Sequence, residues 1–160
     1  PICQFLRVIP RVATLDVVME PALARGWSRD SAELRARSLL ARLNIPERLW
    51  QLAPGTFSGG EQQRVNIARG FMVEWPILLL DEPTAAFDQG SEKQVIDYLQ
   101  QWLGKRTLVI TTHKKSMLAL VERAVVLRQG RVIMDGPLEQ VVQGNQVQAP
   151  QAAEGGNHGL

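Results

Sequence analysis

Hydrophobic and polar positions follow two different patterns along the chain. Across residues 12–50, and again from Glu61 to Trp75, apolar side chains recur at the three- and four-residue spacing of helices. Residues 76–81 and 107–111 are short apolar runs without alternation, which is typical of strands buried on both faces of a parallel sheet. Helical spacing returns between those runs, from about residue 91 to residue 103. The alternation of helices and buried strands predicts an α/β fold with a mainly parallel core.

The last part of the chain carries a different arrangement. A helix is predicted over about 115–121, and two short strands, 124–128 and 131–134, are joined by a tight Gln-Gly turn and so form a hairpin. A final short helix is predicted over roughly 137–142. Residues 144–160 are rich in Gln, Gly, Ala and Asn and have little to bury, so we predict a disordered tail there.

Composition narrows the function only slightly. The chain is 45% hydrophobic and 21% charged, which is ordinary for a soluble globular protein, and its net charge of +2 is too small to indicate nucleic-acid binding. The small basic clusters Arg35/Arg37 and Lys114/Lys115 are expected to be solvated helix faces. Cys3 is the single cysteine, which excludes an intrachain disulfide and fits a reducing compartment.

The stretch Ser58-Gly59-Gly60 precedes a predicted helix. A helix N-terminus presents unpaired N–H groups and a partial positive charge, and glycines let the backbone approach a phosphate without a Cβ in the way. An N-capped turn is the more common use of such residues. On its own, this stretch therefore does not establish an anion site.

Two adjacent carboxylates, Asp81 and Glu82, come at the end of the first apolar strand. Ligands of open α/β sheets bind at that edge, and neighbouring anions there are costly unless a cation or a reaction uses them. Asp81 could hold Mg²⁺ directly or through water, and Glu82 could polarise an attacking water. The alternative is a solvated acidic turn.

Three further stretches of the sequence carry candidate site residues. His113 follows the second strand, so parallel pairing would bring it to the edge that carries Glu82, where it could contact a phosphate or orient a water. The stretch Ala86-Phe87-Asp88 comes directly after the carboxylates. Gln4, near the start, could reach a metal or water. Taken alone, a histidine at a strand end is more often structural, and Gln4 says little.

Together and in this order, these residues resemble the ATP-binding cassette (ABC) family, over about residues 1–143. The matching stretches are the signature loop Ser58–Gln62, the Walker B strand Ile77–Glu82, the D-loop Ala86–Asp88, the switch histidine His113 and the Q-loop glutamine Gln4. Two positions depart from the usual Leu-Ser-Gly-Gly-Gln signature, since Phe57 replaces Leu and Glu61 replaces the last Gln. We expect Phe57 to be an apolar anchor, and Glu61 to gain from the helix dipole.

The resemblance implies a P-loop NTPase-like parallel sheet with an ABC helical subdomain. It implies a Q-loop and helical subdomain over 1–57, a signature helix and carboxylate half of the core over 58–143, and a tail over 144–160. The implied cofactors are ATP and Mg²⁺. The implied roles are catalysis by Glu82 and His113, nucleotide binding by Ser58, Gly59, Gly60, Gln4 and Asp88, and metal binding by Asp81 and Gln4.

In the family, two cassettes pack head to tail, and ATP lies between the P-loop of one and the Ser-Gly-Gly helix of the other. The implied partners are therefore a second nucleotide-binding domain, as a homodimer or heterodimer, and either a membrane permease or subunits of a carbon–phosphorus lyase complex, with no nucleic acid. The implied location is the cytoplasm or the inner face of the plasma membrane. Residues 4–11 and 57–70 resemble the ABC subunit of the phosphonate carbon–phosphorus lyase system. Residues 105–132 look more like exporter ATPases of type I secretion.

One essential motif is missing from these 160 residues. An ABC ATPase needs a P-loop, G-x-x-x-x-G-K-S/T, and the sequence contains none. In the family this loop lies upstream of the Q-loop, so we expect the sequence to be a C-terminal fragment whose first core strands and P-loop precede residue 1. One alternative is a DNA-repair or chromosome-organising head domain, but the helical segment 12–56 is too short for the coiled-coil or zinc insertion of those proteins and has no Cys pairs. The other is a non-catalytic module that supplies only the signature face to a competent cassette.

Overall fold

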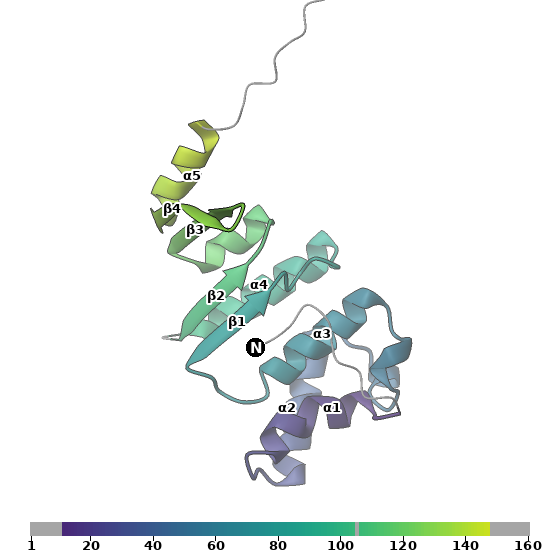
Figure 1. Ribbon diagram of the computed structural model, residues 1–160. Coiled ribbons are helices and arrows are strands. Elements are labelled where there is room, and N and C mark those ends of the chain that lie inside the picture. The colour runs from purple at the N-terminus through teal and green to yellow at the C-terminus, as the bar shows by residue number, and fades with distance from the viewer. Residues whose placement is uncertain (1–10, 105, 148–160) are drawn as a thin grey trace, which may run out of the picture. The chain divides into compact units, whose positions relative to one another are not determined.

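The computed structural model describes residues 11–104 and 106–147, which form two compact units divided between Met117 and Leu118. The first unit contains four α-helices, two parallel strands and two short 3-10 helices (Figure 1). In chain order these are α1 (Thr14–Leu23), α2 (Arg29–Arg42), η1 (Glu47–Leu49), η2 (Pro54–Thr56), α3 (Gly59–Gly70), β1 (Ile77–Asp81), α4 (Gln89–Leu103) and β2 (Thr107–Thr111). The predicted α/β class is confirmed for this part of the chain.

The second unit is built on an antiparallel hairpin, β3 (Arg123–Arg128) and β4 (Arg131–Pro137), as predicted. The helix predicted over about 115–121 is the 3-10 helix η3 (Lys115–Leu120), which leads into the hairpin. The last helix, α5 (Leu138–Val147), packs against both strands and runs past its predicted end at residue 142. The expectation of disorder from residue 144 is therefore wrong up to Val147, because the buried Val141 anchors the helix. Residues 148–160 lie outside the described residues.

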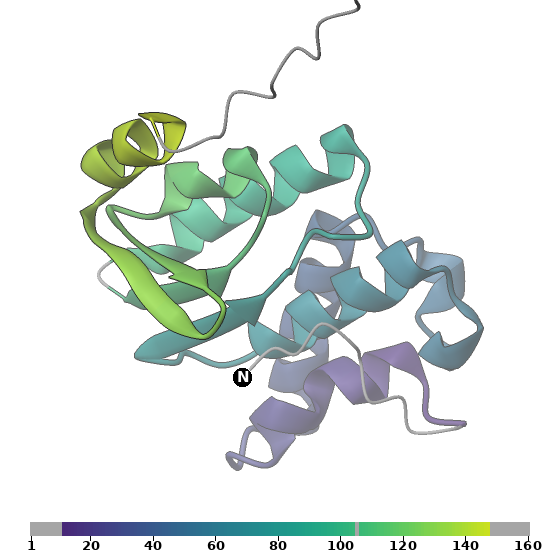
Figure 2. The ribbon, with the colours of Figure 1, turned by 45° about the horizontal axis from the view of Figure 1, so that its top comes forward.

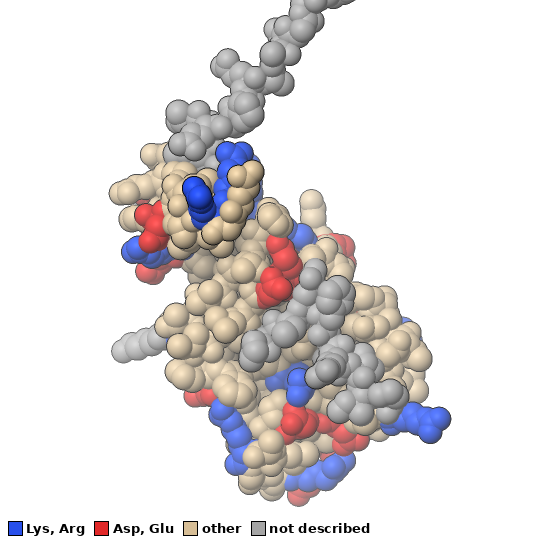
Figure 3. Space-filling view, in the orientation of Figure 1, with Lys and Arg blue, Asp and Glu red and all other residues tan. Residues whose placement is uncertain are grey.

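Helices α1, α2 and α3 pack on one another around a core of small and branched side chains. Ser28 caps the start of α2 by accepting a hydrogen bond from the Ser31 N–H at 3.3 Å. The fully buried side chains of this core include Val18, Met19, Ala22, Ala32, Ala36, Leu40, Val65 and Ala68. On the surface of these helices, ion pairs link different elements, as between Arg69 of α3 and Glu20 of α1 at 2.7 Å. The face drawn in Figure 3 mixes basic and acidic side chains.

The two strands pair in parallel, in a register that runs from Ile77 beside Thr107 to Asp81 beside Thr111. The expectation that β1 is buried on both faces is wrong for the described chain. Ile77 and Leu79 are 58% and 45% exposed, whereas the alternate positions of the strand are buried. The described residues cover only one face of this pair of strands, so the apolar run that predicted a second layer is half exposed.

Aromatic contacts join the three-helix part to α4, which runs alongside the strands (Figure 2). The buried ring of Phe71, at the end of α3, lies 5.1 Å from the Tyr98 ring and 5.0 Å from the Trp102 ring, measured between centroids. The Arg35 guanidinium donates hydrogen bonds of 3.0 Å to the carbonyls of Phe71 and Met72. Arg35 was expected on a solvated face, but it satisfies backbone carbonyls at the C-terminal end of α3 instead.

We predict that Phe71→Ala lowers the free energy of unfolding by about 3 to 5 kcal/mol, because it removes two ring contacts and leaves a cavity in the core. Urea unfolding followed by circular dichroism would measure this. The matched control is Leu34→Ala, since Leu34 is exposed and should shift the unfolding free energy little. Equal losses in the two variants would contradict a central role for Phe71.

Candidate functional site

The Ser-Gly-Gly stretch forms the capped start of α3. Ser58 is the N-cap, and Gly59 and Gly60 are the first two helical residues, so the helix begins two residues before the predicted Glu61. The Ser58 hydroxyl accepts from the Glu61 N–H at 3.3 Å, while the Glu61 carboxylate accepts from the Ser58 N–H at 2.9 Å and from its hydroxyl at 2.7 Å. This reciprocal pairing is a capping box.

Glu61, the departure from the usual signature, is thus held by Ser58. Hydrogen bonds from the Ser58 hydroxyl and then its N–H lower the pKa of Glu61, with a smaller contribution from the charge of Arg64. The carboxylate is therefore ionised at neutral pH and stabilises the first turn of the helix. The observed partners of Ser58 are those of a cap, so any phosphate contact by its hydroxyl requires the Glu61 side chain to release it.

Gly60 approaches the turn that follows β1. A Cβ added to Gly60 would lie 3.1 Å from the Ala86 carbonyl oxygen, which is tighter than ordinary van der Waals contact. Next to this contact, the Arg64 guanidinium lies 5.7 Å from the centroid of the Phe87 ring. The structure therefore brings the stretch Ser58–Gly60 and the stretch Ala86–Asp88 together, and glycine at position 60 permits the approach.

The two carboxylates occupy different environments at the end of β1. Asp81 is the last residue of the strand and accepts a hydrogen bond from the Thr111 hydroxyl on the neighbouring strand. Glu82 has a φ of 42°, an uncommon backbone conformation for a side chain of this kind. Its N–H donates to the Thr111 carbonyl at 3.0 Å, and its own carbonyl accepts from Ala85 at 3.1 Å. These bonds turn the chain sharply just after the strand.

His113 lies beside Glu82, as parallel pairing predicts. The Nε2 atom of His113 is 3.5 Å from the Oε1 atom of Glu82, within ion-pair range but long for a hydrogen bond. The histidine side chain is 97% exposed and that of Glu82 is 22% exposed. An exposed imidazole therefore lies beside a mostly covered carboxylate at the ends of the two strands.

Asp88 acts as the N-cap of α4. Its carboxylate accepts from the Ser91 N–H and from the Ser91 hydroxyl, each at 2.9 Å. These bonds, the backbone one foremost, lower the pKa of Asp88. The observed contacts are thus structural, and the nucleotide role implied for Asp88 remains a prediction.

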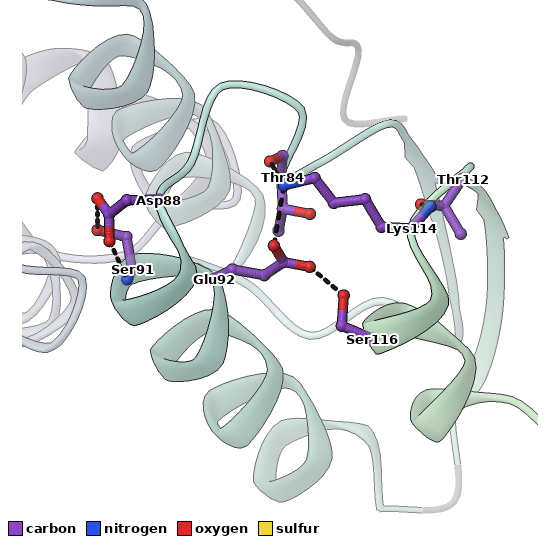
Figure 4. Close-up of polar contacts among 7 residues, drawn as sticks. All are labelled: Thr84, Asp88, Ser91, Glu92, Thr112, Lys114 and Ser116. Carbon is purple, nitrogen blue, oxygen red and sulfur yellow. Dashed lines mark hydrogen bonds and ion pairs between the residues drawn. The ribbon is translucent and has the colours of Figure 1, made fainter.

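A cluster around Lys114 was missed by the sequence reasoning, which placed Lys114 on a solvated face. Its Nζ atom contacts the Thr84 carbonyl and the Glu92 carboxylate, and Ser116 donates to the other oxygen of Glu92 (Figure 4). One sequence signal was available. Glu92 comes three residues before Val95 and seven before Leu99, so it lies on the buried stripe of α4, where a carboxylate needs a partner.

The metal-binding expectation has limited support from this geometry. Among the described residues, no group of three or more His, Cys, Asp or Glu side chains could hold a metal ion. Asp81 and the Thr111 hydroxyl do offer oxygen donors, and Mg²⁺ in nucleotide sites takes one or two carboxylates together with phosphates. The residues therefore fit an ion held mainly by a nucleotide. Gln4, the other predicted ligand, lies outside the described residues.

The family model described as ABC transporter matches residues 2–85, which is just over half of the sequence. The chain belongs to the ABC transporter family. The arrangement agrees with this assignment, because Ser58-Gly59-Gly60 forms a capped helix start, and Glu82 and His113 meet at the ends of parallel strands. Within the described residues, no helix has both the length and the apolar character needed to cross a membrane.

Relatives and solved structures agree with this assignment. The chain is 40% identical over 134 residues to the lipoprotein-releasing system ATP-binding protein LolD of Geobacter metallireducens, covering 82% of this chain and 59% of that protein. It is 38% identical over 135 residues to the macrolide export ATP-binding/permease protein MacB of Chromobacterium violaceum, covering 84% of this chain and 21% of that protein. The chain thus spans less than two thirds of the length of each of these relatives.

A dimeric, post-hydrolysis structure of an ATP-binding cassette bound to ADP and Pi aligns with a TM-score of 0.78 and 30% identity. The alignment covers 86% of this chain and 61% of that one. A second dimeric structure of the same bacterial ABC transporter cassette aligns with a TM-score of 0.75. The fold of an ABC cassette is therefore confirmed over the part that this chain covers.

We predict that Glu61→Ala lowers the free energy of unfolding at pH 7 by about 1 kcal/mol, because both hydrogen bonds to the carboxylate are lost. The pKa of Glu61 is below its ordinary value of 4.5, so this stabilisation is present above that pH and is lost as the pH falls through the lowered pKa. Urea unfolding at several pH values from 7 to 3 would show whether the unfolding free energies of wild type and Glu61→Ala converge as the pH falls.

The control for this experiment is Asp97→Ala, which removes an exposed carboxylate from the middle of α4. Its effect on the unfolding free energy should be small at every pH. If wild type and Glu61→Ala differ equally at pH 7 and pH 3, the carboxylate is not the source of the stability.

Proposed function

We propose that this chain supplies the signature helix and the carboxylate half of an ABC-type ATPase, which hydrolyses ATP at a head-to-tail interface between two cassettes. The observation that carries the proposal is the 3.5 Å approach of His113 to Glu82 at the ends of paired parallel strands. Membership of the ABC transporter family and the likeness to dimeric cassettes support it.

In this proposal, Glu82 polarises a water for in-line attack on the γ-phosphate, and His113 orients that water or contacts the phosphate. Both groups serve the nucleotide bound in their own cassette. Backbone hydrogen bonds to the Thr111 carbonyl and from the Ala85 N–H fix the main chain of Glu82, which places its side chain at the strand edge beside His113. Mg²⁺, held in part by Asp81, would neutralise charge on the phosphates.

The Ser58-Gly59-Gly60 stretch serves the other nucleotide. Its backbone N–H groups lie at the start of α3, where the helix dipole favours an anion, and no side chain of the two glycines blocks approach. We propose that these groups contact the γ-phosphate held by the partner cassette. Asp88 and Gln4 are proposed nucleotide contacts on the resemblance alone, and the implied division at residues 57 and 143 is likewise a proposal.

We also propose a cellular role, namely transport. The relatives carry names of export and lipoprotein release, which favours a role in transport at the cytoplasmic face of a membrane beside a permease. A role in phosphonate metabolism, with carbon–phosphorus lyase subunits as partners, rests only on the resemblance of residues 4–11 and 57–70. The likeness of residues 105–132 to type I secretion ATPases also points to export.

A second candidate is a non-catalytic module that lends its signature face to a competent cassette. The observation behind it is the capped helix start at Ser58-Gly59-Gly60, which is the part that such a module would supply. Sedimentation of the chain with a P-loop-bearing cassette, with and without ATP, separates the two. Nucleotide-dependent association without turnover at Glu82 would support the module.

We predict that the 160-residue chain alone binds MgATP weakly and hydrolyses it negligibly, because no P-loop lysine or phosphate-binding loop is present. Isothermal titration calorimetry and a phosphate-release assay would measure both properties. Rapid turnover by the purified chain, abolished by Glu82→Gln, would contradict this prediction.

In a complete cassette, meaning a protein that carries these residues together with a P-loop, Glu82→Gln should reduce kcat by about 100-fold or more and leave ATP affinity intact. The amide keeps the size of the side chain but cannot accept a proton. A fluorescent ATP analogue would report affinity, and phosphate release would report kcat. The control is Glu139→Gln, an equal change in α5 of the second unit. Unchanged turnover in Glu82→Gln would remove the role that we give to this residue.

A further inference from the structure

The Lys114 cluster joins three segments that carry proposed site residues. The Nζ atom of Lys114 lies 2.6 Å from the Thr84 carbonyl oxygen and 2.8 Å from a carboxylate oxygen of Glu92 (Figure 4). Thr84 belongs to the turn after Glu82, and Glu92 belongs to the first turn of α4. Lys114 itself directly follows His113. One ammonium group therefore ties the turn after β1, the start of α4 and the turn after β2.

The cluster is sheltered and nearly complete in its bonding. The Glu92 side chain is 10% exposed and that of Lys114 is 30% exposed. Ser116 donates to the second oxygen of Glu92, and the N–H of Lys114 donates to the Thr112 hydroxyl at 3.0 Å. Burial alone would raise the pKa of Glu92, but hydrogen bonds from Lys114 and Ser116 outweigh it and lower the pKa. Glu92 is thus a buried anion that needs the lysine.

The carbonyl of Thr84 is the link to the site. It accepts from the Phe87 N–H at 3.0 Å as well as from Lys114, and Thr84 is itself buried. The same short turn begins at Glu82 and ends at Asp88, which caps α4. On the other strand, the imidazole of His113 is open to solvent, so its position depends on the backbone that Lys114 anchors.

We propose that Lys114 is a positioning residue, which sets the separation of Glu82 and His113 by clamping the turns that follow β1 and β2 to each other through Thr84 and Glu92. The consequence for catalysis rests on the function proposed above, whereas the clamp itself rests only on the observed contacts of Lys114. Lys114 contacts neither of the two proposed catalytic side chains in the described structure, so its effect passes through the backbone of both turns.

The first test uses the 160-residue chain and needs no nucleotide. In Lys114→Met, which keeps the length of the side chain but removes the charge, amide hydrogen exchange at Ala85 and Phe87 should accelerate about tenfold or more. Exchange in the pairing of β1 with β2 should stay within about twofold of wild type. The matched control, Lys115→Met, alters the exposed neighbouring lysine and should leave all of these amides unchanged.

The second test uses the complete cassette defined above. Lys114→Met should lower kcat by about 10- to 100-fold, because small misplacements of reacting groups are costly, with KM for ATP within about twofold. Lys114→Arg, which keeps a cation able to reach both acceptors, should restore most of the loss. Glu92→Gln should act in the same direction and more weakly, since Ser116 can still donate to the amide oxygen.

The two tests separate the clamp from the proposed function. Unchanged exchange at Ala85 and Phe87 in Lys114→Met would overturn the clamp, and so would faster exchange throughout β1 and β2, which would indicate general destabilisation. A wild-type cassette without ATPase activity would overturn the proposed function while the exchange result still decides the clamp. Local loosening with full kcat would overturn the proposed link to catalysis.

Discussion

The parallel pairing of β1 with β2 is the interaction on which the candidate site depends. Its register sets Asp81 beside Thr111. Directly after the strand, the Glu82 N–H donates a hydrogen bond to the Thr111 carbonyl. The strands end together, so the residues that follow them, Glu82 and His113, come within 3.5 Å of each other. A one-residue slip would move each side chain to the opposite face and separate the pair.

Two capped helix starts then fix the surroundings of this strand edge. Ser58 begins α3 and Asp88 begins α4, and in each case a short side chain satisfies an N–H three residues later. The caps are costly to replace for stability, and both residues are also proposed nucleotide contacts. If the proposed contacts are correct, the same side-chain atoms serve both capping and nucleotide binding, so mutational data at these positions need a folding control.

Much of this arrangement could be predicted from the sequence, because it depends on local patterns. The two apolar runs gave both strands, and their shared edge placed His113 beside Glu82. What the sequence could not supply was long-range pairing. Arg35 and Lys114 look like ordinary solvated cations, and only the folded chain brings them to buried carbonyls. The continuous apolar run of β1 was misleading about burial, since the described residues cover only one face of the strand.

The close approach of Gly60 to Ala86 has a consequence for which residues position 60 can carry. In the proposed dimer, the helix start at Gly60 faces one nucleotide, whereas the turn at Ala86 belongs to the strand edge that serves the other. A Cβ at position 60 would lie 3.1 Å from the Ala86 oxygen, so any residue larger than glycine would crowd that carbonyl. One substitution at Gly60 would therefore strain the start of α3 and the turn before Asp88 together, although the two segments are 26 positions apart in the chain.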